Sequence, residues 1–174
     1  MNVEKLEKAL RRIPDFPKKG IVYIDITPIL QDSDLFQLTI DLLAERYIVS
    51  PPDYIAAVDA RGFIFGGALA VKLGCGFVPI RKKGKLPYKT LVEKYDLEYG
   101  SAEIEIHTDA VPAGSKVLLI DDLLATGGTV AAAVKLLEKL EAQIIGIEFV
   151  VELGFLNGRQ RLGDYPVDSL IVEK

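Results

Sequence analysis

Two adjacent carboxylates and the polar turn after them are the part of this sequence best suited to chemistry. Asp121 and Asp122 follow an apolar run, and the turn ATGGT occupies residues 125–129. Glycines in such a turn let backbone N–H groups approach an anion closely, and a helix that starts there adds partial positive charge. The hydroxyls of Thr126 and Thr129 can donate hydrogen bonds to the same anion. The segment therefore predicts a phosphate site with carboxylates beside it.

A turn of this composition has a second interpretation, as the N-terminal cap of a helix that follows a strand. It lacks the lysine of GxxxxGK[ST] and does not read GxGxxG, so the two common nucleotide loops do not apply. The carboxylate pair weighs against a simple cap, because adjacent buried carboxylates carry desolvation and repulsion costs. Ribose hydroxyls, with a divalent cation nearby, would offset those costs, and Mg²⁺ prefers such oxygen surroundings. We therefore favour a ligand site within residues 117–129.

Three other features could carry chemistry. The turn Asp59-Ala60-Arg61-Gly62 follows another apolar run, and the planar guanidinium of Arg61 suits phosphate oxygens, so this is a second anion site or a surface turn. The basic run RKKGK at 81–85 is by itself a solvated face or a weak anion patch. Cys75 lies between two glycines in an apolar stretch, which favours a small structural residue over a nucleophile.

The elements that must position these turns follow an alternating pattern. Apolar runs at 54–58, 77–80, 116–120 and 144–151 alternate with helical patterns at 63–73 and 130–140. Strands that are apolar on both faces imply a mostly parallel sheet with helices on both sides, an α/β fold. Such folds bind ligands at the carboxyl ends of their strands, and both polar turns lie there.

Residues 81–111 interrupt the alternation with a long polar segment. The stretch 103–107 alternates in polarity, which predicts a strand with one solvent-facing side, and Leu91, Val92 and Tyr95 could form its antiparallel partner. A long excursion of this kind in a compact domain is typically a lid or a binding loop. We expect a hairpin that leaves the sheet.

Composition bounds the remaining choices. The chain has 174 residues, 49% of them hydrophobic and 26% charged, and a net charge of −4, which predicts one globular domain. A mildly acidic chain is not expected to coat nucleic acid. One cysteine and one histidine exclude an internal disulfide and two-histidine metal sites. The N-terminus does not read as a signal peptide, and no apolar run approaches a membrane span, so we expect a cytoplasmic protein with no membrane partner.

Five motifs, in order, resemble those of one enzyme family. VLLIDDLLATGGT (117–129) is similar to the phosphoribosyl-pyrophosphate (PRPP) signature of type I phosphoribosyltransferases. The wider pattern resembles the adenine phosphoribosyltransferase family, and the match runs from about residue 13 to the end. The other motifs are IPDFPKKGIVYIDITPIL (13–30), DARGFIFG (59–66), RKKGKLPYKT (81–90) and LEYG (97–100).

The resemblance implies a fold, a reaction and partners. The fold would be the type I phosphoribosyltransferase fold, a single domain over 1–174 with a small N-terminal hood (1–30) that binds the base and a flexible catalytic lid (81–111). The reaction would transfer the phosphoribosyl group of PRPP to N9 of adenine, giving AMP and pyrophosphate in purine salvage. The cofactor would be Mg²⁺, held mainly by PRPP and water without direct protein ligands. The protein would be a homodimer.

The resemblance also implies roles for single residues. Glu98 would be the catalytic carboxylate, and Tyr99 would help to close the lid. Asp121 and Asp122 would hold the ribose hydroxyls and orient magnesium. The 5′-phosphate would be bound by Ala125, Thr126, Gly127, Gly128 and Thr129. Pyrophosphate would be bound by Arg61, Arg81, Lys82 and Lys85, the last three acting across the dimer interface. Adenine would be bound by Val22, Tyr23, Ile24 and Leu153.

One departure from the family pattern and two alternatives stay open. The family usually has arginine or lysine where this chain has Ile24, which leaves adenine recognition intact only if the contact there is through backbone. The 117–129 segment alone would also fit a type I enzyme for a 6-oxopurine or orotate. A non-catalytic PRPP-sensing regulator is a third interpretation, although such proteins add a DNA-binding module, for which the first 50 residues leave no room.

Overall fold

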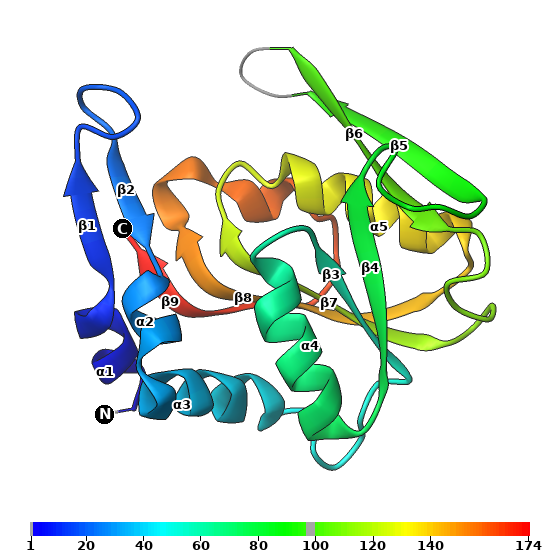
Figure 1. The fold of residues 1–174 in the computed structure, drawn as a ribbon, viewed down its shortest axis with the longest axis horizontal. Coiled ribbons are helices and arrows are strands. Elements are labelled where there is room, and N and C mark those ends of the chain that lie inside the picture. Colours follow the sequence, from blue (N-terminus) through cyan, green and yellow to red (C-terminus); the bar gives the residue numbers. More distant parts are fainter. Residues whose placement is uncertain (1, 97–99) are drawn as a thin grey trace.

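A seven-stranded sheet forms the centre of the computed structural model, which describes residues 2–96 and 100–174. The strand order is β5-β6-β4-β3-β7-β8-β9 (Figure 1). The strands are β3 (Tyr54–Val58), β4 (Gly76–Lys82), β5 (Thr90–Asp96), β6 (Ser101–His107), β7 (Lys116–Leu124), β8 (Gln143–Leu153) and β9 (Val167–Glu173). Neighbours from β4 to β9 pair in parallel, and β6 joins β4 and β5 antiparallel. The sheet is therefore mostly parallel, as predicted.

Helices cover both faces of this sheet. They are α1 (Asn2–Ala9), α2 (Thr27–Gln31), α3 (Ser33–Ala44), α4 (Gly62–Leu73) and α5 (Gly128–Lys139). Alternate residues of β7 enter two separate cores: Val117 and Leu119 pack with α5, whereas Leu118 and Ile120 pack with the other four helices. This two-sided burial explains the unbroken apolar runs and confirms the predicted α/β fold.

The N-terminal segment adds a small layer at one side of the sheet (Figure 1). Strands β1 (Arg11–Pro14) and β2 (Val22–Asp25) pair with each other in a separate antiparallel sheet. Arg12 of β1 donates to Glu173 of β9, which ties this layer to the last strand of the central sheet. This layer corresponds to the expected hood.

Residues 81–111 differ from the expectation in one respect. The hairpin forms with the predicted partners, Leu91 opposite Ile106 and Val92 opposite Glu105, but β6 also pairs with the end of β4. The hairpin is therefore the antiparallel edge of the central sheet and does not leave it. Glu105 is also not on a wet face: it is 3% exposed, because backbone N–H groups nearby satisfy its carboxylate.

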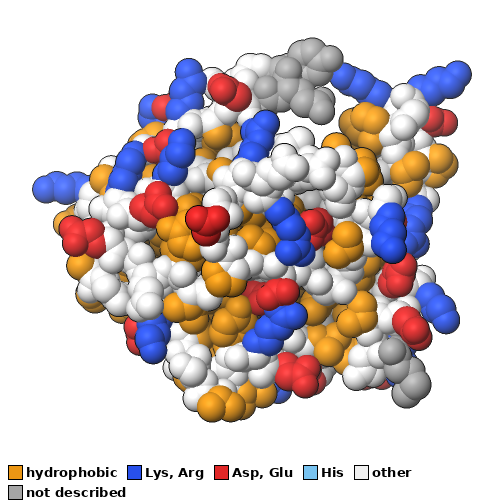
Figure 2. Space-filling view, turned by 180° about the vertical axis from the view of Figure 1, so that it is seen from behind, with side chains coloured by type: hydrophobic (Ala, Val, Ile, Leu, Met, Phe, Trp, Pro, Cys, Tyr) orange, Lys and Arg blue, Asp and Glu red, His pale blue; other side chains and the backbone are white. Residues whose placement is uncertain are grey.

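Two further observations concern the surface and the helices. In Figure 2, acidic and basic side chains interleave over the face shown, with apolar side chains between them. Within residues 2–96 and 100–174, the structure contains no helix long and apolar enough to cross a bilayer.

Candidate functional site

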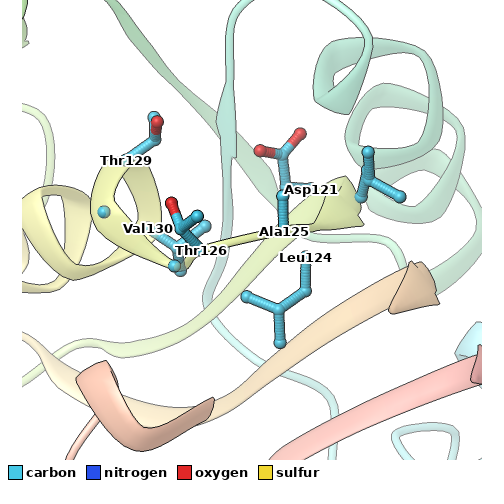
Figure 3. Close-up of a pocket in the computed structure, with 9 residues that line it drawn as sticks. Asp121, Leu124, Ala125, Thr126, Thr129 and Val130 are labelled. Carbon is cyan, nitrogen blue, oxygen red and sulfur yellow. The ribbon is translucent and has the colours of Figure 1, made fainter. Parts of the chain in front are cut away.

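The predicted phosphate turn joins β7 to α5. Strand β7 runs through Leu124, beyond the carboxylates where the sequence had placed its end, so the turn itself is only three residues long. Gly127 adopts a φ of 79°, a left-handed conformation that favours glycine, and α5 begins directly after it. A pocket of about 80 Å³ at the turn is lined by Asp121 and residues 123–130. Figure 3 shows the side chains of Asp121, Thr126 and Thr129 pointing to the same side of the turn.

The two carboxylates of β7 lie side by side, with Asp122 buried and Asp121 half-buried. Asp122 is 4% exposed, and its backbone N–H donates to Asp121 Oδ1 at 2.8 Å. Burial, and then the neighbouring charge of Asp122, raise the pKa of Asp121 well above its usual value. Burial also raises the pKa of Asp122, although the nearby Arg61 guanidinium opposes this rise. A ligand that supplies hydroxyl donors or a cation would therefore stabilise the charged form of this carboxylate pair.

The second polar turn lies against the first. Strands β3 and β7 are parallel neighbours, so their carboxyl ends meet. Arg61 Nε is 2.7 Å from Asp122 Oδ2, and a Cβ built on Gly62 would lie 2.8 Å from Asp121 Oδ1. The contact leaves room for glycine only, and it brings a guanidinium, two carboxylates and the phosphate turn into one site, as the sequence predicted.

Arg61 also connects this site to the hood. Its NH1 group donates to the hydroxyl of Tyr23 at 2.6 Å. Val22 and Ile24 lie on the opposite face of β2 from Tyr23, since side chains alternate along a strand. There they line a groove of about 590 Å³ together with Leu153. The four predicted base residues are thus near one another but on two sides of β2.

Of the predicted basic residues at 81–85, Arg81 contacts other residues of the chain, whereas the side chains of Lys82 and Lys85 face solvent. Arg81 Nε is 2.9 Å from Asp59 Oδ2, and Arg81 NH1 donates to the backbone oxygen of Lys85 at 3.3 Å. Arg81 therefore interacts with the Asp59–Gly62 turn of its own chain. The side chains of Lys82 and Lys85 are exposed. The predicted Glu98 and Tyr99 lie outside the described residues.

Three buried glutamates take part in contacts that the sequence analysis missed. Glu105 accepts hydrogen bonds from the backbone N–H groups of Lys85 and Leu86, each at 2.8 Å. Glu148 accepts from the hydroxyl of Tyr47 at 2.8 Å, and Glu152 accepts from Arg159. A signal was present for Glu148 and Glu152, because each interrupts an apolar run, and a charge at such a position needs a partner.

The acidic side chains at this site bear on how a magnesium ion could be held there. Within the described residues, no group of three or more histidine, cysteine, aspartate or glutamate side chains could hold a metal ion. Asp121 and Asp122 place hard oxygen atoms side by side, which fits an ion that is held by a phosphate ester and water and is contacted by the two carboxylates through water.

Comparison with known proteins agrees with this geometry. The model of the phosphoribosyl transferase domain family matches residues 28–171. The chain is 55% identical to an adenine phosphoribosyltransferase from Solidesulfovibrio magneticus, over 95% of this chain and 97% of the relative. The structure is similar to that of an adenine phosphoribosyltransferase from Thermoanaerobacter pseudethanolicus, with a TM-score of 0.94, 51% identity and coverage of 98% and 99% of the two chains. The Saccharomyces cerevisiae enzyme, solved with adenine and an imino-altritol bisphosphate, has a TM-score of 0.92 at 46% identity, covering 97% of this chain and 98% of its own.

Proposed function

Since the chain belongs to the adenine phosphoribosyltransferase family, we propose that its site transfers the phosphoribosyl group of PRPP to N9 of adenine, giving AMP and pyrophosphate in purine salvage. One observation supports this most directly: the Asp121–Asp122 pair stands between the phosphate turn and the Arg61 turn. In PRPP, a ribose with two hydroxyls joins a 5′-phosphate to a pyrophosphate. A site for PRPP therefore needs a phosphate turn, hydrogen-bond acceptors for the hydroxyls and a cation, in that order.

The phosphate turn takes the 5′-phosphate. Backbone N–H groups of 125–129 and the hydroxyls of Thr126 and Thr129 supply donors, and the N-terminus of α5 supplies partial positive charge. Asp121 and Asp122 accept hydrogen bonds from the ribose hydroxyls. When Mg²⁺ is bound, it neutralises pyrophosphate charge, and the two carboxylates orient it through water.

Pyrophosphate leaves toward the Arg61 turn. Negative charge grows on the departing group while the ribose becomes cation-like, so fixed cations and carboxylates placed on either side lower the barrier. Arg61 approaches the pyrophosphate by exchanging its bond with Asp122 for phosphate oxygens. Lys82 and Lys85, which are exposed here, supply further positive charge from the partner subunit of a homodimer. The resemblance placed Arg81 with these two lysines at the partner's site, but its contact with Asp59 of its own chain supports a role through the Asp59–Gly62 turn instead.

Adenine binds between the hood and the end of β8. Leu153, Val22 and Ile24 give the groove apolar walls, whereas Tyr23, on the other face of β2, provides an aromatic face near Arg61. Glu98, in the segment 97–100, handles the proton that adenine N9 loses, and Tyr99 closes the lid against water. Recognition at Ile24 is through its backbone, because its side chain is 7% exposed and apolar. We place the reaction in the cytoplasm.

The deciding experiment is turnover with purified protein. Adenine, PRPP and Mg²⁺ should give equimolar AMP and pyrophosphate, and hypoxanthine, guanine and orotate should give much slower release. Pyrophosphate release that does not depend on adenine would contradict the proposed function. Faster turnover with hypoxanthine than with adenine would indicate that Ile24 alters base preference. In that case Ile24→Arg should restore the preference for adenine.

A further inference from the structure

The phosphate turn is held from outside its pocket by a second backbone segment. A Cβ built on Gly158 would lie 2.3 Å from the backbone oxygen of Ala125, and one built on Gly127 would lie 2.4 Å from the oxygen of Gly158. Both distances are far below ordinary contact, so the two backbones touch. The pocket lining comes from residue 121 and residues 123–130, and Gly158 is not part of it. The position of the turn therefore depends on the position of Gly158.

The segment that carries Gly158 follows β8 and consists of two short 3₁₀ helices, Gly154–Leu156 and Gly158–Arg161. In Figure 1 this orange segment lies between β2 and the loop that precedes α5. Its first helix also borders the base groove, since Phe155 and Leu156 line that groove with Leu153. One short segment thus touches the walls of both proposed subsites.

Arg159 fixes this segment to the sheet. Its Nε and NH2 groups donate to the carboxylate of Glu152 at distances between 2.6 and 2.9 Å. NH1 donates to the backbone oxygen of Val167 at 2.6 Å, and Ser169 Oγ donates to Glu152 at 2.7 Å. Glu152 is 5% exposed, and the hydrogen bonds from Arg159 lower its pKa although burial raises it. Such a bidentate pair defines direction as well as distance.

We propose that Arg159 is a positioning residue for the phosphate turn: through Glu152 it holds Gly158 against Ala125 and Gly127, and so sets where the 5′-phosphate binds. Arg159 lines neither the pocket at the phosphate turn nor the base groove. The inference rests on the proposed function, because it takes the 125–129 turn as the 5′-phosphate site. Arg159, in the second 3₁₀ helix, would thus influence substrate affinity through its contacts with β8 and β9, although it lies away from the pocket itself.

The test compares two ligands that use different halves of the site. Ribose 5-phosphate probes the 125–129 turn, and pyrophosphate probes the Arg61 turn. A relative from Trypanosoma brucei has been solved with AMP, pyrophosphate and ribose-5-phosphate, so both probes suit this fold. Calorimetric titration would compare wild type with Arg159→Ala, Arg159→Lys and Gly158→Ala. Gln160→Ala, an exposed change on the same segment, is the matched control.

We expect Arg159→Ala and Gly158→Ala to bind ribose 5-phosphate about tenfold more weakly, since a displacement of about 1 Å is costly at such a site. Pyrophosphate affinity should stay within about twofold, Arg159→Lys should recover part of the loss, and Gln160→Ala should match wild type. Unchanged ribose 5-phosphate affinity in Arg159→Ala, or equal loss of both ligands, would overturn the inference. If Arg159→Ala does not fold, Arg159→Lys decides: it should still bind ribose 5-phosphate more weakly than wild type with pyrophosphate affinity unchanged, and wild-type ribose 5-phosphate affinity would overturn the inference. If wild type binds pyrophosphate but not ribose 5-phosphate, the proposed function fails first and the inference with it.

Discussion

The carboxylates of Asp121 and Asp122 are proposed to bind the ligand, but at neutral pH they lower the stability of the unliganded fold. Asp122 is buried and Asp121 beside it is half-buried, and loss of contact with water raises the pKa of each. A carboxylate whose pKa is raised by folding favours the native state below its unfolded pKa of about 3.8, and that advantage disappears as pH rises toward the folded pKa. At neutral pH the unliganded fold therefore bears a cost that PRPP binding offsets.

Asp121→Asn should separate these two effects. The amide oxygen can still accept from the Asp122 N–H, so the free energy of unfolding at pH 8 should rise by about 1 kcal/mol, and the gain should shrink toward pH 4. PRPP affinity should fall at least about tenfold, because the carboxylate no longer accepts the ribose hydroxyls. Urea unfolding at both pH values and calorimetric titration measure the two quantities. Asp164→Asn, the same change at an exposed position, should alter neither; PRPP binding unchanged in Asp121→Asn would refute the assigned role.

Gly62 offers a residue-scale test of how closely the two anion-binding turns approach. A methyl group there would meet Asp121 Oδ1 at 2.8 Å and the backbone oxygen of Ile120 at 3.3 Å. Gly62→Ala should lower the free energy of unfolding by about 1–3 kcal/mol and weaken PRPP binding. Gly67 lies in the same helix with nothing within 4 Å of its Cβ position, so Gly67→Ala should raise stability by about 0.5–1 kcal/mol. Equal effects of the two changes in thermal and urea unfolding would show that the turns are not tightly packed.

At the scale of elements, Glu105 joins the edge hairpin to the pyrophosphate side of the site. Its carboxylate accepts hydrogen bonds from the backbone N–H groups of Lys85 and Leu86. Arg81 donates to the backbone oxygen of Lys85 and also contacts Asp59. Burial raises the pKa of Glu105, but these N–H bonds outweigh it and the pKa is lowered. A lowered pKa gives stability that is present above the unfolded pKa of about 4.5 and lost as pH falls through the folded pKa.

Glu105→Gln should therefore destabilise the protein by about 1–3 kcal/mol at pH 7, with a smaller deficit below about pH 4. Amide exchange at Lys85 and Leu86 should become faster, because the neutral amide is a weaker acceptor. Glu103→Gln removes only an exposed pair with Lys83 and should cost no more than about 0.5 kcal/mol. Equal amide exchange at Lys85 and Leu86 in the two variants would contradict the stabilising role of their hydrogen bonds to Glu105.

The elements also show how far sequence reasoning reaches. Period and turn residues located the strands and helices, because a sheet covered on both faces requires continuous apolar runs. The motifs identified the turns that meet at the site. The end of β7 was placed too early, because Asp121 and Asp122 look like turn residues unless their partners are known. The Arg159–Glu152 pair was missed for the same reason: a partner distant in the sequence decides whether a charge can be buried.

At the scale of the whole molecule, the site gathers at one side of the sheet while the cores lie between sheet and helices. The phosphate turn, the Arg61 turn and the hood meet at the carboxyl ends of parallel strands, where the backbone changes direction and pocket walls can vary without loss of core. Among the described residues, Lys82 and Lys85 are proposed site residues whose side chains are exposed and lie outside this cluster in one chain. A homodimer in which they reach the partner's site would complete it.

Complementation between inactive subunits tests this arrangement. Glu98→Gln and Lys85→Ala should each inactivate their own homodimers, the first by loss of the acid–base group and the second by weaker pyrophosphate binding. In a mixed dimer, one site then combines the intact Glu98 of one subunit with the intact Lys85 of the other. An equal mixture, unfolded and refolded together, should regain about a quarter of wild-type activity, since about half the dimers are mixed and each has one complete site. If Lys85 served its own subunit's site, every site would carry one defect and mixing would restore nothing. Light scattering on the mixture confirms that the subunits have paired, so an inactive mixture of dimers would refute the proposed exchange across the interface.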